Sequence, residues 1–126
     1  MPVLKIILGR LLQTVLITVF ATVHLSAQPV SREYQIKAVF IFNFTQFVDW
    51  PATAFPNADA PLVIGVLGVN PFGSYLAETV TGEKVNGHPV IVQYYNHPEE
   101  IRDCHILFVG LPDTQKAGQV ISGLKD

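Results

Sequence analysis

The sequence contains a single cysteine, Cys104, in 126 residues, which excludes an intramolecular disulfide. In an oxidising compartment a lone cysteine is either a buried, inert thiol or one half of an intermolecular bridge. Cys104 closely precedes the apolar run 106–109, and free cysteine is among the most buried residue types. The sequence therefore favours a buried thiol and leaves the intermolecular bridge as the alternative.

Basic residues are also scarce. The chain has eight Lys and Arg against ten Asp and Glu, a formal net charge of −2, and only 14% of its residues are charged. Domains that bind nucleic acid typically carry a basic patch or stripe. The sequence has no such cluster, so its composition argues against a nucleic-acid partner.

The motifs of common catalytic and metal sites are missing as well. The histidines beyond the N-terminal segment are His88, His97 and His105, and no pair of them has the i, i+4 spacing of two ligands on one helix. No serine stands in a G-x-S-x-G context. We therefore expect no metal, no cofactor and no catalytic group. Structural or solvated roles are expected for the three histidines.

The N-terminal segment has the pattern of an export signal. Lys5 and Arg10 precede an apolar run, 11–23, and Ser26 and Ala27 supply small residues for cleavage. The run is shorter than the roughly 20 residues that a membrane-spanning helix needs, although an uncleaved anchor is the alternative. We predict that the first 27 residues are a signal peptide and that the protein is periplasmic. Residues 28–126 then form one small domain.

Aromatic residues gather in one segment, 34–51, which holds four of the eight phenylalanines and the only tryptophan. Ser31 can cap a helix here and Pro51 ends it. Apolar side chains fall on several faces, which predicts a long apolar N-terminal helix. A helix that is apolar all round is usually buried, and replacing Phe44 or Trp50 by alanine in a core would cost about 3–5 kcal/mol. Alternatively, one face is an intermolecular contact, for which the candidate partner or dimer residues are Tyr34, Phe40, Phe44, Phe47 and Trp50.

Downstream of this helix, strand and helix patterns alternate. Run 62–67 is continuously apolar and rich in branched residues, as in a strand that is covered on both faces, and 90–95 and 105–109 are predicted as the second and third core strands. Helical patterns cover 72–80 and 115–124. The alternation predicts an α/β fold with a doubly wound, mostly parallel sheet of three core strands, in a three-layer α/β/α arrangement. The pair Asn86-Gly87 also indicates a tight turn, in a hairpin or in an exposed contact loop.

A glycine-rich turn follows the first predicted strand. Such a turn can hold a phosphate at the start of a helix, and the carboxyl ends of strands are the usual ligand positions in α/β sheets. Its spacing fits neither G-x-G-x-x-G nor the P-loop, which favours a tight structural turn. Gly68, Asn70 and Gly73 nevertheless form a candidate loop for a small ligand.

Four segments in a fixed order carry a resemblance to a known family. They are Tyr34-x-x-Lys37-Ala38-x-Phe40-x-Phe42-Asn43-Phe44-x-x-Phe47-Val48-Asp49-Trp50-Pro51, then Pro61-Leu-Val-Ile-Gly65-Val-Leu-Gly68-Val-Asn70-Pro71-Phe72-Gly73, then Val85-Asn86-Gly87-His88-Pro89-Val90, then Cys104-His105-Ile106-Leu107-Phe108-Val109. Together they resemble the YfiR-like family of periplasmic proteins.

The resemblance implies a secreted α/β protein without enzymatic activity. Such a protein binds and restrains a membrane-anchored signalling enzyme, typically a diguanylate cyclase, and forms dimers. The alternative is a periplasmic domain that binds a small ligand at the loop from Gly68 to Gly73. Relative to the family, two departures are expected. This chain resembles a domain truncated at its C-terminus, and Cys104 lacks the second cysteine of the family's structural disulfide.

Overall fold

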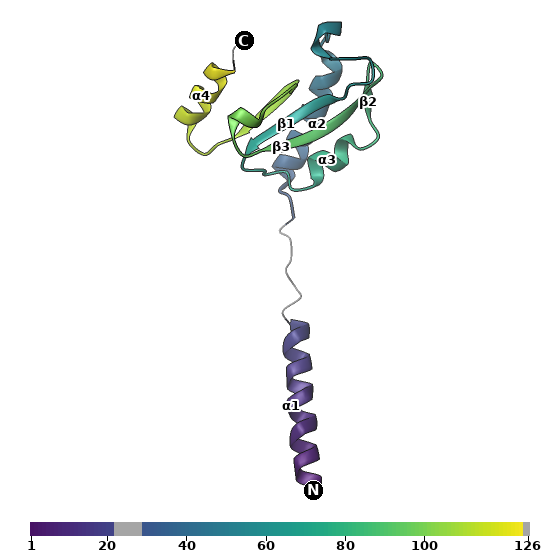
Figure 1. Cartoon of the computed structure of the whole chain (residues 1–126), viewed down its shortest axis with the longest axis vertical. Helices are drawn as coiled ribbons and strands as arrows, with labels where there is room; N and C mark the ends of the chain where they lie inside the picture. Colours follow the sequence, from purple (N-terminus) through teal and green to yellow (C-terminus); the bar gives the residue numbers. More distant parts are fainter. Residues whose placement is uncertain (22–28, 125–126) are drawn as a thin grey trace.

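The computed structural model describes residues 1–21 and 29–124 (Figure 1). The expected cleavage point after Ala27 lies outside the described residues. The elements are, in order, α1 (Pro2–Ala21), α2 (Arg32–Phe47), the 3-10 turn η1 (Ala52–Ala54), β1 (Leu62–Gly68), α3 (Tyr75–Val80), β2 (Lys84–Val85), β3 (His88–Tyr95), the 3-10 turn η2 (Pro98–Glu100), β4 (Ile106–Gly110) and α4 (Thr114–Gly123).

The sheet has four strands in the order β2-β3-β1-β4. β1 lies between β3 and β4 and is parallel to both, while the two-residue β2 is antiparallel to β3. Asn86 and Gly87 join β2 to β3 with φ of 53° and 88°, the positive values that a two-residue hairpin turn requires. The predicted α/β class and mostly parallel sheet are confirmed, and the short hairpin strand joins the three expected strands.

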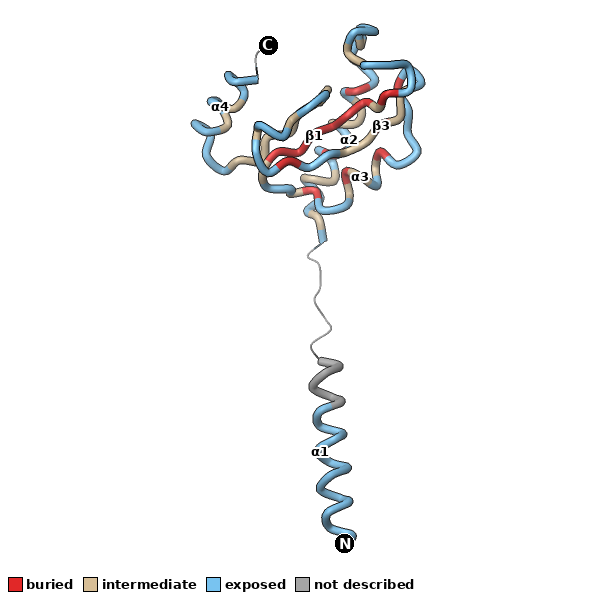
Figure 2. Tube along the Cα trace, viewed as in Figure 1, coloured by how far each residue is buried: buried red, intermediate tan, exposed pale blue. Residues whose placement is uncertain are grey.

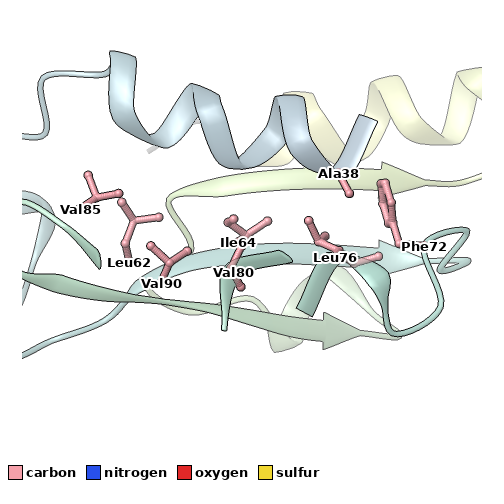
Figure 3. Close-up of a cluster of buried hydrophobic side chains, with 9 residues drawn as sticks. Ala38, Leu62, Ile64, Phe72, Leu76, Val80, Val85 and Val90 are labelled. Carbon is pink, nitrogen blue, oxygen red and sulfur yellow. The ribbon is translucent and has the colours of Figure 1, made fainter. Parts of the chain in front are cut away.

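The core lies between one face of the sheet and two helices (Figure 3). Alternate residues of β1, Leu62, Ile64 and Val66, belong to one buried cluster. The same cluster contains Ala38 of α2, Leu76 and Val80 of α3, Phe72, Val85 and Val90. Successive side chains of a strand point to opposite faces, so α2 and α3 must cover the same face of the sheet.

The opposite face is crossed by the segment between β3 and β4, which contains η2. A β carbon built on Gly65 of β1 would lie 2.7 Å from Sγ of Cys104 and 2.8 Å from the ring of Tyr95. Only glycine therefore lets this segment approach the sheet so closely. α4 lines a shallow hollow together with Pro98 and Glu99 of η2, and none of its described residues is buried. The expected second helical layer is thus present only as this segment and a loosely packed helix.

The expectation of a helix that is apolar on all sides is not supported. α2 buries only Ala38 and Thr45, and its outer surface is open to solvent (Figure 2). That surface also carries the exposed ion pair of Glu33 with Lys37. The apolar residues seen in the sequence are therefore divided between a core face and an exposed face. Across residues 1–21 and 29–124, no helix is long and apolar enough to cross a membrane.

Candidate functional site

The outer face of α2 carries three exposed phenylalanines, Phe40, Phe44 and Phe47, which we call the aromatic ridge. Their side chains are 55%, 53% and 83% exposed. Residues three and four apart lie on the same face of a helix, and the Phe40 and Phe44 rings are in fact neighbours, with centroids 6.3 Å apart. None of the three side chains is ionisable, so the ridge is an uncharged aromatic surface.

The two other candidate contact residues, Tyr34 and Trp50, are placed differently. Both are half-buried and pack against the core cluster. The Tyr34 ring meets Phe72 edge-on, with centroids 5.5 Å apart. A contact role for Tyr34 and Trp50 stays a prediction, but their packing shows that each also joins α2 to the domain. The structure likewise corrects the expectation that Phe44 is a core residue.

The N-terminal end of α2 is fixed by capping. Ser31 adopts an extended conformation, and its side chain accepts a hydrogen bond from the N–H of Tyr34. The side chain of Gln35 reaches back to donate to the carbonyl of Val30 at 3.0 Å. Glu33 lies in the first turn, where a negative charge favours the positive end of the helix dipole. The hydrogen bond that Lys37 donates to the carboxylate of Glu33 also raises the pKa of Lys37.

The C-terminal end of α2 is held by Trp50. The indole Nε1–H donates to the carbonyl oxygen of Thr45 at 2.8 Å, so a side chain satisfies a carbonyl at the end of the helix. Thr45 is itself fully buried, and its hydroxyl donates to the carbonyl of Phe42. The Trp50 ring lies edge-on to His105, with centroids 5.5 Å apart. The ridge therefore ends on an anchored turn.

His105 extends this anchor into a stack of rings. Phe55 lies between two histidines, with its ring centroid 3.6 Å from that of His88 and 4.7 Å from that of His105. His88 is the first residue of β3, and His105 directly precedes β4. Trp50, His105, Phe55 and His88 thus form one aromatic stack, which connects the end of α2 to the amino ends of two strands.

The hydrogen bonds of His105 define its tautomer. The backbone N–H of Val63 donates to Nδ1 of His105 at 3.0 Å, so Nδ1 carries no proton. Nε2 lies 3.0 Å from the carbonyl oxygen of Ala54, which can only accept, so Nε2 carries the proton. His88 donates from Nδ1 to the carbonyl of Ala60 at 2.7 Å. Both histidines therefore have the predicted structural role, because each ring is hydrogen-bonded to the backbone of another segment.

No pattern in the sequence predicted this stack. His88 and His105 are 17 positions apart and belong to two separate segments of the family resemblance. They come close together because they lie at the amino ends of β3 and β4, the two parallel strands that flank β1. His97 lies apart from them, exposed, next to η2. In the described part of the chain, no group of three or more His, Cys, Asp and Glu is arranged to hold a metal ion.

The glycine-rich loop forms a self-contained turn. Gly68 and Gly73 have φ of 81° and 53°, which favour glycine. The side chain of Asn70 accepts from the N–H of Phe72 and donates to the carbonyl of Gly73, both at 3.0 Å. The polar groups of Asn70 are thus engaged within the loop, and α3 begins only at Tyr75. The use of Gly68, Asn70 and Gly73 for a ligand stays a prediction.

Cys104 is half-buried and unpaired, near the end of the segment that crosses the sheet. Its thiol donates to the carbonyl of Ile106 at 3.1 Å. Burial raises the pKa of the Cys104 thiol, because a thiolate is poorly solvated there, although backbone hydrogen bonds partly oppose the shift. A raised pKa lowers the thiolate fraction at neutral pH, so the thiol is poorly reactive.

Comparison with known proteins supports one assignment. No curated protein and no solved structure gives a significant match to the chain. A family model described as YfiR/HmsC-like matches residues 34–126, which include most of α2, the whole sheet and the aromatic stack. The match covers most of the chain and agrees with the resemblance seen in the sequence, and we conclude that this protein belongs to the YfiR/HmsC-like family.

Proposed function

We propose that this protein is a non-enzymatic periplasmic regulator that binds and restrains a membrane-anchored signalling enzyme, a diguanylate cyclase or a sensor kinase. Membership of the family supports this class of function. The single observation on which the proposed contact surface depends is the aromatic ridge. Aromatic residues are enriched at protein–protein interfaces, and exposed apolar patches on small domains commonly mark interaction sites.

The way the ridge is held also supports binding. α2 is capped at Ser31 and anchored by Trp50 to the aromatic stack, so Phe40, Phe44 and Phe47 project from a fixed helix. A surface that is already ordered loses less conformational entropy on binding than a flexible one. Uncharged rings at positions i, i+4 and i+7 suit a partner with an apolar groove. An amphipathic helix usually binds by placing its apolar face in such a groove. We place the partner's groove over this ridge.

The proposed location follows from the N-terminal segment. Lys5 and Arg10 lie in α1, whose described apolar side chains are exposed on all sides. A basic start followed by an apolar run is the pattern of a secretory signal. We propose that residues 1–27 direct export and that residues 28–126 act in the periplasm. There the domain can reach the extracytoplasmic part of an inner-membrane protein.

A second copy of the chain is proposed to use the same ridge when the partner is absent. The exposed rings then pair in a homodimer, which shields them from water. Light scattering of the purified protein should give the mass of a dimer for the wild type and of a monomer for a variant with Phe44→Asp and Phe47→Asp. A wild-type monomer at tens of micromolar would contradict this dimer.

Regulation is tested in cells with matched variants. In a strain that lacks the protein, cyclic-di-GMP is measured after reintroduction of the wild type, the Phe44→Asp and Phe47→Asp variant, or Ile121→Asp. Ile121 is a matched control, because it is apolar, 55% exposed and located on α4. We expect the wild type and Ile121→Asp to lower cyclic-di-GMP and the ridge variant to fail.

A photo-crosslinker at position 44 supplies the second measurement. We expect an adduct with one inner-membrane protein, and none from position 121. A kinase partner would give the adduct while cyclic-di-GMP stays constant. The proposal fails if the ridge variant restrains signalling as well as the wild type does, or if position 44 gives no adduct with a membrane protein.

A further inference from the structure

A pocket of about 280 Å³ lies at the carboxyl ends of β1 and β4. The loop that follows β1 leads to α3 on the helix-covered face, whereas the loop that follows β4 leads to α4 beside η2. The two connections therefore diverge above neighbouring strands. In open α/β sheets, ligands bind in the crevice outside the carboxyl ends of the strands at such a divergence.

The side chains that line this pocket are almost all apolar. Tyr34 and Phe108 contribute rings to the wall, and Val69, Pro71, Leu111 and Pro112 form the two rims. Among the described residues, no charged side chain lines it, and Tyr34 contributes the only polar side-chain group, its hydroxyl. Lys37 lies over the Tyr34 ring, but it is paired with Glu33. Pockets for small molecules are typically apolar with a few polar groups that fix orientation.

Both rims are fixed before any ligand arrives. The N–H of Val69 donates to the carbonyl of Gly110 at 2.9 Å, which ties the two loops together. The turn around Asn70 orders one rim through its two side-chain hydrogen bonds. Beyond the other rim, the side chain of Asp113 accepts from the N–H groups of Gln115 and Lys116 and so caps α4. A pocket that is already ordered avoids the entropic cost of forming on binding.

We propose that this pocket binds a small, neutral, ring-containing molecule, which would make the protein a sensor as well as a regulator. The ring lies against Phe108 and the two prolines, and the Tyr34 hydroxyl orients it by one hydrogen bond. The missing positive charge disfavours phosphates and other anions, despite the adjoining glycine-rich turn. None of Phe40, Phe44 and Phe47 lines the pocket, so this inference and the proposed function can fail separately.

Indole is the probe for this site, and inorganic phosphate is the anionic comparison. Amide shifts of the 15N-labelled protein are followed during titration with each compound. We expect indole to shift the amides of Val69, Gly110 and Leu111 saturably, with a dissociation constant on the order of millimolar for so small a ligand. Phosphate should leave these amides unchanged.

Three variants locate the binding. Val69 is 63% exposed at the rim, so Val69→Trp can block the mouth without disturbing the core, and it should weaken indole binding at least tenfold. Ile121→Trp places the same ring on α4 and should bind as the wild type does. Tyr34→Phe keeps the ring and should lose about fivefold, the value of one hydrogen bond.

Several results would overturn the assignment. One is the lack of saturable shifts at the pocket amides, and another is indole binding that Val69→Trp leaves unchanged. Saturable shifts of the same amides by phosphate would instead identify an anion site. Equal weakening by Ile121→Trp would show that the effect comes from added surface aromatic area rather than from the pocket.

Discussion

Replacing Trp50 by alanine tests whether the end of α2 is anchored as described. A fully buried large aromatic typically contributes about 3–5 kcal/mol, and Trp50 is half-buried, so lost packing should cost about 2 kcal/mol. The change also removes the donor to the carbonyl of the buried Thr45, which adds about 1 kcal/mol. We expect the free energy of unfolding to fall by about 3 kcal/mol, a large part of the roughly 5–15 kcal/mol of a whole domain.

The assay is urea unfolding followed by far-ultraviolet circular dichroism, because the variant lacks the only tryptophan. Trp50→Phe keeps a ring in place but loses the N–H donor, and should cost about 1 kcal/mol. Phe44→Ala removes a ring that is more than half exposed, and should cost less than about 1 kcal/mol. The reasoning is refuted if Trp50→Ala stays within 1 kcal/mol of the wild type, or if Phe44→Ala costs as much.

Three further changes test the sheet and its covering segment. His105→Ala should cost about 2–3 kcal/mol by urea unfolding, because the Val63 N–H loses its acceptor. 15N spectra of the wild-type imidazole should show the proton on Nε2; a proton on Nδ1 would contradict the hydrogen bonds. Gly65→Ala should cost about 1–3 kcal/mol through overpacking, and a simultaneous Cys104→Ala should recover part of that loss. If Gly65→Ala lowers the free energy of unfolding equally with and without Cys104→Ala, the added methyl group does not clash with Cys104. Alkylation of Cys104 should need higher pH than alkylation of a free thiol, and denaturant should abolish the difference. The pKa of Cys104 is higher in the folded protein than in the unfolded chain, so the protonated thiol favours folding. This contribution to the free energy of unfolding is fully present below the ordinary thiol pKa and is lost as pH rises through the raised pKa.

Local sequence signals predicted most of the secondary structure. Ser31 caps α2 as expected, since a serine oxygen can accept from an N–H of the first turn wherever the helix packs. Asn86-Gly87 forms the hairpin turn, because these residues tolerate positive φ. The three predicted runs became β1, β3 and β4, and β1, which is the most uniformly branched of them, is buried on both faces. These choices depend on a few neighbouring residues, so the sequence reveals them.

Only the tertiary structure decided which apolar side chains of α2 are covered. The sequence placed aromatic rings on several faces, but the sheet and α3 can cover just one of them, and this leaves Phe40, Phe44 and Phe47 exposed. The pairing of His88 with His105 around Phe55 also depends on strand order, which brings together residues that are distant in sequence. Such contacts arise from the global path of the chain, and local propensity does not encode them.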